Sequence, residues 1–261
     1  MDESGLMYLS VLPFVAMILT GGLGTRLRPV VSDRPKPMAL VEGVPFLEIL
    51  IDCLAGKGVR DFVLLTGYKA DMIESGLGQR SRGDLNLRFS HEHIPLGTGG
   101  AVRHASRFCT NPSLVVNGDT FFDADLEMLY RFHLEKKAAV TLSLMRVDDE
   151  SRYGSVCLED DGRISGFKEK SETPGRPGLI NAGLSLMSKD FILKLPEDVA
   201  FSMERDIFPA FARTGKLFGL LQDQPFFDIG TPESYEAFRA YARDMVFHRR
   251  VRGEHGDDDR I

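Results

Sequence analysis

The stretch Leu-Thr-Gly-Gly-Leu-Gly-Thr-Arg-Leu-Arg-Pro-Val-Val-Ser-Asp-Arg-Pro-Lys-Pro-Met, residues 19–38, decides how the rest of the chain is interpreted. It follows an apolar run, residues 14–18, that predicts a buried strand. Its glycines let the backbone approach a ligand closely, and the exposed N–H groups of such a turn favour an anion. Arg26, Arg28 and Lys36 add fixed positive charge. Together these features predict a phosphate site, and the amount of charge suggests a triphosphate.

Two common phosphate-binding motifs do not fit this stretch. A dinucleotide-binding turn needs Gly-x-Gly-x-x-Gly before a helix, and a Walker loop needs Gly-Lys followed by Ser or Thr. The pattern Gly-Gly-x-Gly-Thr-Arg-Leu, followed by Pro-Lys-Pro-Met, instead resembles the signature of the sugar-1-phosphate nucleotidyltransferases, also called nucleotide-sugar pyrophosphorylases. The resemblance extends over residues 15–241.

Composition narrows the class of protein. The chain has 261 residues, of which 43% are hydrophobic and 27% charged, as in an ordinary globular domain. Its net charge of −6 argues against a general nucleic-acid binder. No segment reaches the roughly 18 apolar residues of a membrane span, and the apolar residues 6–19 lack the basic region of a signal peptide. Three widely spaced cysteines indicate neither a disulfide framework nor a zinc site. We therefore expect a cytoplasmic protein with no nucleic-acid or membrane partner.

The expected organisation is one nucleotidyltransferase domain over residues 13–245. A short extension, residues 1–12, precedes it, and a disordered tail, residues 246–261, follows it. Within the domain we expect a nucleotide-binding part over 13–125 and a sugar-phosphate-binding part over 126–245. The chain lacks the repeats of a hexapeptide solenoid.

Alternating apolar segments predict an α/β fold with a mixed, mostly parallel sheet flanked by helices. The family resemblance implies that this is the Rossmann-like nucleotidyltransferase fold, which is similar to glycosyltransferase A, with a small inserted hairpin as a sugar-binding lobe. Strands are expected at 14–18, 62–66, 87–90, 113–119, 139–145, 152–158, 163–167 and 179–187; helices are expected at 45–54, 70–77, 101–108, 125–137 and 200–213; residues 226–235 predict a strand, a turn and the start of a helix.

Three segments should meet at one edge of the sheet. The glycine turn at 21–24, the glycines of 97–100 and Asp119 each follow a predicted strand. Because ligands bind at the carboxyl ends of parallel strands, we expect these segments to line one crevice. We interpret 97–100 as a ligand-binding loop before a helix.

The resemblance assigns roles to individual residues. Asp119 and Asp228 match the family's two magnesium-binding aspartates, and hard carboxylate oxygens suit Mg²⁺. Arg26 matches the catalytic arginine and Lys36 the lysine beside it. The nucleotide-binding set is Leu19, Gly21, Gly22, Gly24, Thr25, Glu92, Gly97 and Thr98. The sugar-phosphate-binding set is Gly154, Glu169, Lys170, Asn181 and Gly183, with Lys170 on the phosphate and Glu169 on sugar hydroxyls.

The implied reaction is in-line attack of a sugar 1-phosphate on the α-phosphorus of a nucleoside triphosphate, which releases pyrophosphate. A phosphate monoester has its second pKa near about 6, so the nucleophile is anionic at pH 7 and needs no general base. The sequence shows no Ser-His-Asp arrangement. We therefore interpret His91 and His93 as structural or base-flanking residues.

Glu92 predicts the base. It occupies the position where thymidylyl and uridylyl relatives commonly have glutamine, and a carboxylate can accept hydrogen bonds from both N1–H and the N2 amino group of guanine. We therefore favour GTP. Uridylyl-, thymidylyl- and cytidylyltransferases of the same family remain alternatives.

The sugar is predicted by resemblance alone. Segments 30–33, 118–122, 152–156 and 201–206 resemble the guanylyltransferases of D-glycero-α-D-manno-heptose 1-phosphate more closely than those of mannose 1-phosphate. Thr20, where the family usually has alanine, and Met203, where the heptose group tends to have an aromatic residue, depart from the pattern. Mannose 1-phosphate therefore remains an alternative substrate.

Two other classes of protein are alternatives to this enzyme. The same fold could serve as a nucleotide-sugar-sensing regulatory subunit, although this chain keeps Arg26, Lys36 and both aspartates. Asp123-Ala124-Asp125 has the Asp-x-Asp form of a glycosyltransferase metal motif, but we expect it to cap the following helix. Relatives suggest a homodimer.

Overall fold

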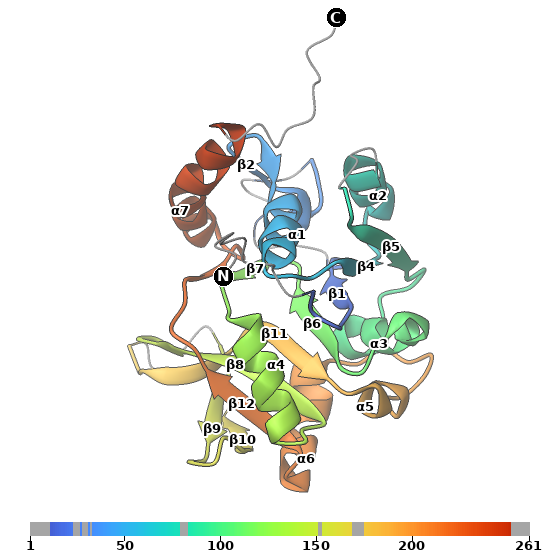
Figure 1. Ribbon diagram of the computed structural model, residues 1–261, viewed down its shortest axis with the longest axis vertical. Coiled ribbons are helices and arrows are strands. Elements are labelled where there is room, and N and C mark those ends of the chain that lie inside the picture. Colours follow the sequence, from blue (N-terminus) through green and yellow to red (C-terminus); the bar gives the residue numbers. More distant parts are fainter. Residues whose placement is uncertain are drawn as a thin grey trace, which may run out of the picture.

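Figure 1 shows the computed structural model of the protein. The structure describes residues 11–22, 27, 31, 33–78, 83–150, 153–168 and 175–251, and of residues 244–251 it describes the backbone alone. The described residues include a nine-stranded mixed sheet. Its strands are β1 (Ala16–Leu19), β4 (Asp61–Thr66), β5 (Asn86–His91), β6 (Ser113–Asn117), β8 (Val140–Val147), β9 (Ser155–Leu158), β10 (Ile164–Lys168), β11 (Gly178–Met187) and β12 (Leu217–Leu221).

The sheet has a parallel half and a mixed half. Strands β5, β4, β1 and β6 lie side by side and run parallel. Strand β11 then pairs antiparallel with β6, β8 and β9; β12 runs parallel to β8, and β10 forms an antiparallel hairpin with β9. The carboxyl ends of the four parallel strands therefore meet at one edge.

Helices cover both faces of the sheet. Alternate residues along β1 and just before it enter different cores: Ala16 and Ile18 belong to one, Met17 and the preceding Val15 to the other. The first core is completed by α1 (Phe46–Gly56), α2 (Ala70–Gly78), α4 (Leu126–Glu135) and α7 (Pro232–Val251), and the second by α3 (Gly97–His104), α5 (Lys189–Leu193) and α6 (Phe208–Phe211). In Figure 1, α1, α2 and α7 lie in the upper half and α4, α5 and α6 in the lower half.

Two small antiparallel ladders complete the fold. The first joins β2 (Leu40–Val41) to β3 (Val44–Pro45). The second joins β7 (Thr120–Phe122), just after the parallel half, to β13 (Phe226–Asp228) near the chain's end. In the second ladder Asp228 is opposite Thr120, so two segments far apart in sequence are fixed beside each other.

Helix starts follow local sequence signals. Asp125 caps α4 by accepting a hydrogen bond from the N–H of Met128 at 2.8 Å. Ser188 caps α5 in the same way through the N–H of Phe191. Ser202 begins a π-helical turn, η4 (Met203–Ile207), which leads into α6.

The expected α/β fold class, with a mixed sheet flanked by helices, is confirmed. Several local expectations need correction. The glycines of 97–100 are not a loop, because α3 begins at Gly97. The expected helix over 200–213 is broken into η4, α6 and the 3-10 turn η5 (Ala212–Thr214). Strands β7 and β12 and helix α5 were not expected.

Two structural observations concern the edges of the predicted domain. Leu12, placed in the extension, is buried and its N–H donates to the carbonyl of Gly58 at 2.9 Å. At the other end, the helical backbone of α7 continues to Val251, past the predicted domain end at 245. Residues 1–10 and 252–261 lie outside the described part. Among the described helices, none combines the length and apolar character required to span a membrane.

Candidate active site

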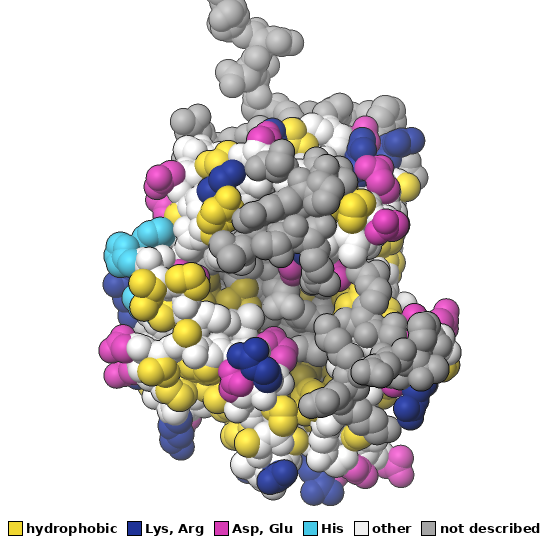
Figure 2. All heavy atoms as spheres, turned by 180° about the vertical axis from the view of Figure 1, so that it is seen from behind, with side chains coloured by type: hydrophobic (Ala, Val, Ile, Leu, Met, Phe, Trp, Pro, Cys, Tyr) yellow, Lys and Arg dark blue, Asp and Glu magenta, His cyan; other side chains and the backbone are white. Residues whose placement is uncertain are grey.

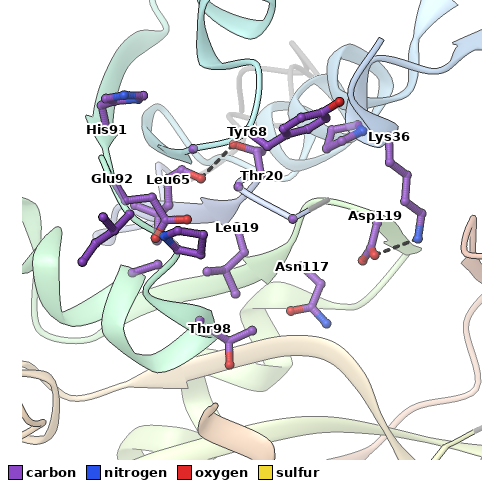
Figure 3. Close-up of a pocket in the computed structure, with 18 of the residues that line it drawn as sticks. Leu19, Thr20, Lys36, Leu65, Tyr68, His91, Glu92, Thr98, Asn117 and Asp119 are labelled. Carbon is purple, nitrogen blue, oxygen red and sulfur yellow. Dashed lines mark hydrogen bonds and ion pairs between the residues drawn. The ribbon is translucent and has the colours of Figure 1, made fainter. Parts of the chain in front are cut away.

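A cavity of about 750 Å³ opens at the carboxyl ends of β1, β4, β5 and β6 (Figure 3). Glu92 and Asp119 lie on opposite sides of it, which gives the cavity two chemically different ends. Figure 2 shows the opposite face of the molecule from Figure 1, and this opposite face is hollowed near its centre. Eight of the predicted site residues line the cavity: Leu19, Gly21, Gly22, Lys36, Glu92, Gly97, Thr98 and Asp119.

One end of the cavity is built around Glu92, which directly follows β5. Its N–H donates to the carbonyl of Thr66 at 2.9 Å, and its Oε2 accepts from the N–H of Leu96 at 3.1 Å. A Cβ atom added to Gly21 would lie 2.6 Å from Oε1 of Glu92, and one added to Gly67 would lie 2.7 Å from it. The carboxylate therefore occupies space that glycines after β1 and β4 leave open.

The environment of Glu92 raises its pKa above the ordinary glutamate value. Partial burial disfavours the charged form, whereas the hydrogen bond from Leu96 and the nearby rings of His104 and His91 act in the opposite direction. His91 and His93 line the cavity beside Glu92, with ring centroids 5.0 Å apart in an edge-to-face arrangement. On the face in Figure 2, histidine side chains gather at one edge. Their position is compatible with the structural or base-flanking interpretation.

The other end of the cavity brings two aspartates and a lysine together. The Nζ atom of Lys36 lies 2.8 Å from Oδ2 of Asp119 and 3.7 Å from Oδ1 of Asp228. The Lys36 side chain is only 7% exposed, whereas that of Asp119 is 41% exposed and faces the cavity. Two carboxylates therefore share one ammonium group at the cavity wall.

Backbone contacts hold both aspartates in place. The N–H of Gly118 donates to the carbonyl of Leu19 at 2.9 Å, and a Cβ atom on Gly118 would lie 2.5 Å from that oxygen. Only glycine allows β6 to approach the end of β1 so closely, and Asp119 follows it directly. The N–H of Ile229, beside Asp228, donates to the carbonyl of Asp119 at 3.0 Å. The β7–β13 ladder thus fixes the spacing of the pair.

Lys36 is presented by a short 3-10 turn, η2 (Lys36–Met38), which has prolines on both sides of the lysine. Pro35 is its N-cap residue and Pro37 lies inside it. Because proline fixes its own φ and restricts the residue before it, this turn holds the lysine backbone with little freedom.

The N-terminal part of α3 differs from its sequence interpretation. Gly97 has φ +70°, and a Cβ atom there would lie 2.5 Å from the carbonyl oxygen of Phe201. A Cβ atom on Gly99 would overlap the ring of Phe201. These glycines therefore make room for the segment before η4. Gly97 and Thr98 line the cavity, whereas Gly99 and Gly100 are buried against protein.

Thr98 connects the cavity to that same segment. Its hydroxyl donates to Oε2 of Glu204 at 2.9 Å and accepts from the N–H of Met203 at 2.9 Å. Ser202 also donates to Oε2 of Glu204, at 3.0 Å. The proton of the Thr98 hydroxyl is thus directed to Glu204.

A narrow recess adjoins the cavity and shares Leu19, Thr98 and Asn117 with it. Asn181 and Gly183 line this recess, at a bulge of β11 where Gly183 has φ +80°. The carbonyl oxygen of the Asn181 side chain accepts from the N–H of Gly183 at 3.1 Å. Gly154, the remaining described member of the predicted sugar set, is exposed just before β9 and lines neither hollow.

Five predicted site residues, Gly24, Thr25, Arg26, Glu169 and Lys170, lie outside the described part of the chain. The Asp-x-Asp segment, residues 123–125, lies within the described part, and both of its aspartates have structural partners. Asp123 pairs with Lys57 at 2.8 Å, and Asp125 caps α4. The capping interpretation is therefore confirmed, and this segment supplies no support for a glycosyltransferase metal motif.

A family model described as nucleotidyl transferase matches residues 15–244 of this chain. The chain belongs to the nucleotidyl transferase family. It is 40% identical over 221 residues to a D-glycero-α-D-manno-heptose 1-phosphate guanylyltransferase of Aneurinibacillus thermoaerophilus, covering 84% of this chain and 94% of that protein. It is 36% identical over 246 residues to a mannose-1-phosphate guanylyltransferase of Mycobacterium tuberculosis, covering 93% of this chain and 68% of that protein.

A solved structure supports the same relationship. HddC from Yersinia pseudotuberculosis superposes with a TM-score of 0.79 at 36% identity, covering 87% of this chain and 99% of that one. A second crystal structure of HddC is a complex with GMP-PN, with a TM-score of 0.76.

The cavity is also lined by residues that the sequence interpretation missed. Tyr68, which follows β4, and Asn117, the last residue of β6, both line the cavity. Gly230 also lines it and lies beside the aspartate pair. The rule that ligands bind at strand carboxyl ends could have found Tyr68 and Asn117. Nothing local in the sequence marks Glu204, which lines the recess, because its place depends on packing against α3.

The carboxylates of Asp119 and Asp228 suit a hard cation that keeps further coordination positions open for other ligands. Asp119 and Asp228 offer carboxylate oxygens close enough to share the Lys36 ammonium. Among the described residues, no group of three or more His, Cys, Asp or Glu side chains could hold a metal. Such a pair resembles the sites where Mg²⁺ is bound by one or two carboxylates together with substrate phosphates.

Proposed function

We propose that this nucleotidyl transferase moves a guanylyl group from GTP to a sugar 1-phosphate, with D-glycero-α-D-manno-heptose 1-phosphate as the favoured acceptor. The observation that carries the proposal is the arrangement of one cavity, with the acceptor carboxylate of Glu92 at one end and the Asp119–Asp228–Lys36 cluster at the other. A base would bind at the first end and phosphates at the second.

The Glu92 end supports guanine. A carboxylate offers acceptors only, and guanine presents two adjacent donors on its Watson–Crick edge. Uracil and thymine present one donor between two carbonyls, which a carboxylate would repel. Glu92 is partly buried, so a wrong base would leave its charge unpaired in a poorly solvated place. The guanylyltransferase names of the similar proteins support the same choice.

The opposite end supports chemistry at phosphate. We propose that Asp119 and Asp228 bind Mg²⁺, which when bound would neutralise charge on the reacting phosphates. Lys36 and Arg26 would supply positive charge to the triphosphate, as expected from the sequence. Gly118 and the β7–β13 ladder would keep the carboxylates aligned so that little reorganisation is needed.

The proposed reaction needs no protein base. A phosphate oxygen of the sugar 1-phosphate attacks the α-phosphorus of GTP, the bond from that phosphorus to the α,β-bridging oxygen breaks, and pyrophosphate leaves with the electron pair. The chain's contribution is to hold the two substrates in line, with the nucleotide in the cavity and the sugar toward the adjoining recess. A reaction that uses GTP fits the cytoplasmic location expected from the sequence.

The acceptor is proposed from the relatives. The A. thermoaerophilus protein supports a heptose, because its name is that of a heptose 1-phosphate guanylyltransferase and this chain covers 94% of its length. The mannose-1-phosphate guanylyltransferase of M. tuberculosis keeps mannose 1-phosphate as the second candidate, since it matches 93% of this chain.

The test is pyrophosphate release with Mg²⁺, measured for each common nucleoside triphosphate against heptose, mannose, glucose and N-acetylhexosamine 1-phosphates. We expect the highest kcat/KM for GTP with the heptose. Higher kcat/KM with mannose 1-phosphate would select the second candidate. Tight GTP binding without pyrophosphate release from any pair would overturn the enzyme proposal in favour of a sensor.

A further inference from the structure

We propose that Lys36 is an internal counter-cation for the aspartate pair, and that its ammonium group and a divalent cation compete for the same two carboxylates. The inference rests on the metal-binding part of the proposed function. It adds a positioning role for Lys36: to keep Asp119 and Asp228 together before the metal arrives, and to yield its place when the metal binds.

The geometry of the Lys36 ammonium is the first support. It lies 2.8 Å from an oxygen of Asp119 and 3.7 Å from an oxygen of Asp228, so it occupies the space between the carboxylates that a shared cation would need. Two carboxylates held this close repel each other when no cation lies between them. Lys36 provides that cation within the described part of the chain.

Burial makes this arrangement less screened by solvent and salt than a surface ion pair. The Lys36 side chain is 7% exposed and that of Asp228 is 13% exposed, whereas that of Asp119 is 41% exposed. Charges removed from water in this way are costly unless they are paired, so the lysine and the aspartates stabilise one another. A dication entering the same space would repel the ammonium group directly. Both positive groups cannot keep the same carboxylate contacts.

The displaced ammonium has a place to go. Lys36 itself lines the cavity, and its backbone is fixed by the proline-flanked turn η2. Only the flexible side chain would move, toward the space where we place the nucleotide phosphates. Metal binding and the release of a phosphate-binding lysine would thus be one event.

The first experiment measures Mn²⁺ binding to the nucleotide-free protein by electron paramagnetic resonance. In Lys36→Met the competing charge is gone, and we expect Mn²⁺ to bind at least about tenfold more tightly than in the wild type, because the repulsion between a unit charge and a dication about 4 Å apart is worth more than that factor even in water. The double variant Lys36→Met/Asp119→Asn should lose this gain in Mn²⁺ affinity. Equal affinity in wild type and Lys36→Met would overturn the proposal.

Lys57→Met is the matched control. Lys57 also pairs with an aspartate at 2.8 Å, Asp123, but outside the cavity lining. Its removal should leave Mn²⁺ affinity unchanged. If Lys57→Met tightens Mn²⁺ binding as much as Lys36→Met does, the effect is one of net charge and the proposal fails.

A second measurement uses the wild-type chain, so it does not depend on how the variant folds. Acylation of lysines is followed by mass spectrometry with and without Mn²⁺. We expect the slow labelling of Lys36 to accelerate when Mn²⁺ is added, while labelling of Lys57 stays constant. Unchanged labelling of Lys36 at saturating Mn²⁺ would contradict displacement. Both experiments omit nucleotide and sugar, so their failure is distinct from a failure to release pyrophosphate.

Discussion

The two ends of the cavity are built on different principles. The Glu92 end uses the carboxyl ends of neighbouring parallel strands, β1, β4 and β5, and contains one partly buried acid among glycines. The Asp119–Asp228 end uses an antiparallel ladder between segments more than a hundred residues apart and contains three charges in contact. The first arrangement suits selection of a base, because its single acceptor group discriminates. The second suits chemistry at phosphate, because its charges can be shared with a ligand.

The strongest test of this division is to remove one carboxylate from the charged end. Asp119→Asn and Asp228→Asn should each lower kcat for pyrophosphate release by about 10²- to 10³-fold, because charge stabilisation in the transition state is lost. The preference for GTP over UTP in a binding assay should persist. Asp123→Asn, which changes an aspartate paired with Lys57, should stay active. Wild-type activity in Asp228→Asn would separate that residue from the site.

The second test changes the Glu92 end. Glu92→Gln should lower kcat/KM for GTP by about 10- to 100-fold, since a charged acceptor is replaced by an amide that presents one acceptor and a donor. The kcat/KM for UTP should change little or rise, which provides an internal control. An equal loss for both nucleotides would indicate a structural role for Glu92.

Glu92 also predicts a pH dependence with a definite sign. Its pKa is raised, mainly by burial, so the carboxylate gains its proton at a higher pH than an ordinary glutamate does. As the pH falls through that raised pKa, the neutral carboxyl loses its value as a double acceptor, and kcat/KM for GTP should fall. The ratio of wild-type to Glu92→Gln kcat/KM isolates this effect from titration of the substrates, and it should decrease toward acid pH. A constant ratio would contradict the assignment.

A smaller effect is expected at the boundary between the cavity and the recess. Thr98→Val removes a hydroxyl that donates to Glu204 and accepts from the N–H of Met203. We expect KM for the sugar 1-phosphate to rise several-fold and the free energy of unfolding to fall by about 1–2 kcal/mol, because a part-buried N–H loses its partner. Thr98→Ser keeps the hydroxyl and should restore both values. A change in base preference instead would place Thr98 with the Glu92 end.

The smallest effect on activity is expected at a site remote from both ends. His133 of α4 is buried, contacts the Thr141 hydroxyl at 2.8 Å, and has its pKa lowered to about 4 by burial. Because the unfolded chain binds a proton near pH 6.5 and the folded chain does not, stability should fall as the pH drops from about 6.5 to about 4, by on the order of 3 kcal/mol. Denaturant unfolding of His133→Gln should show a weaker pH dependence, with kcat unchanged near pH 7.

Sequence reasoning reached the cavity through local signals and Glu92 through resemblance. An apolar run followed by glycine predicts a strand and a close turn, and parallel strand ends must share an edge, so the turn at 21–24, the glycines of 97–100 and Asp119 were expected in one crevice. Glu92 was assigned from its position relative to family members. Sequence reasoning erred where a local signal had a nonlocal cause. The glycines of 97–100 suggested a ligand loop, but Gly99 and Gly100 make space for Phe201 and the segment before it. The local sequence pattern of a segment does not reveal a packing partner that lies a hundred residues away in the chain.

The charged end depended on resemblance more than on pattern. Nothing in the spacing of Asp119 and Asp228 shows that they meet. The strand β7 is only three residues long and was not predicted, and the strand predicted from residue 226 does not reveal which strand it pairs with. The pairing is decided by packing: Phe121 and Phe122 are buried, and the ring of Phe121 lies 5.1 Å from that of Phe238 in α7. Docking of α7 thus helps to bring β13 to β7.

The β7–β13 pairing also has a consequence for synthesis on the ribosome. The four parallel strands and Glu92 are complete once residue 117 has been made, so the half of the sheet that carries the Glu92 end can form early. Asp228 reaches Asp119 only after the strand that carries it has left the exit tunnel. A nascent or truncated chain that stops before residue 226 would therefore lack the acidic pair, and catalytic competence would be acquired only near the end of translation.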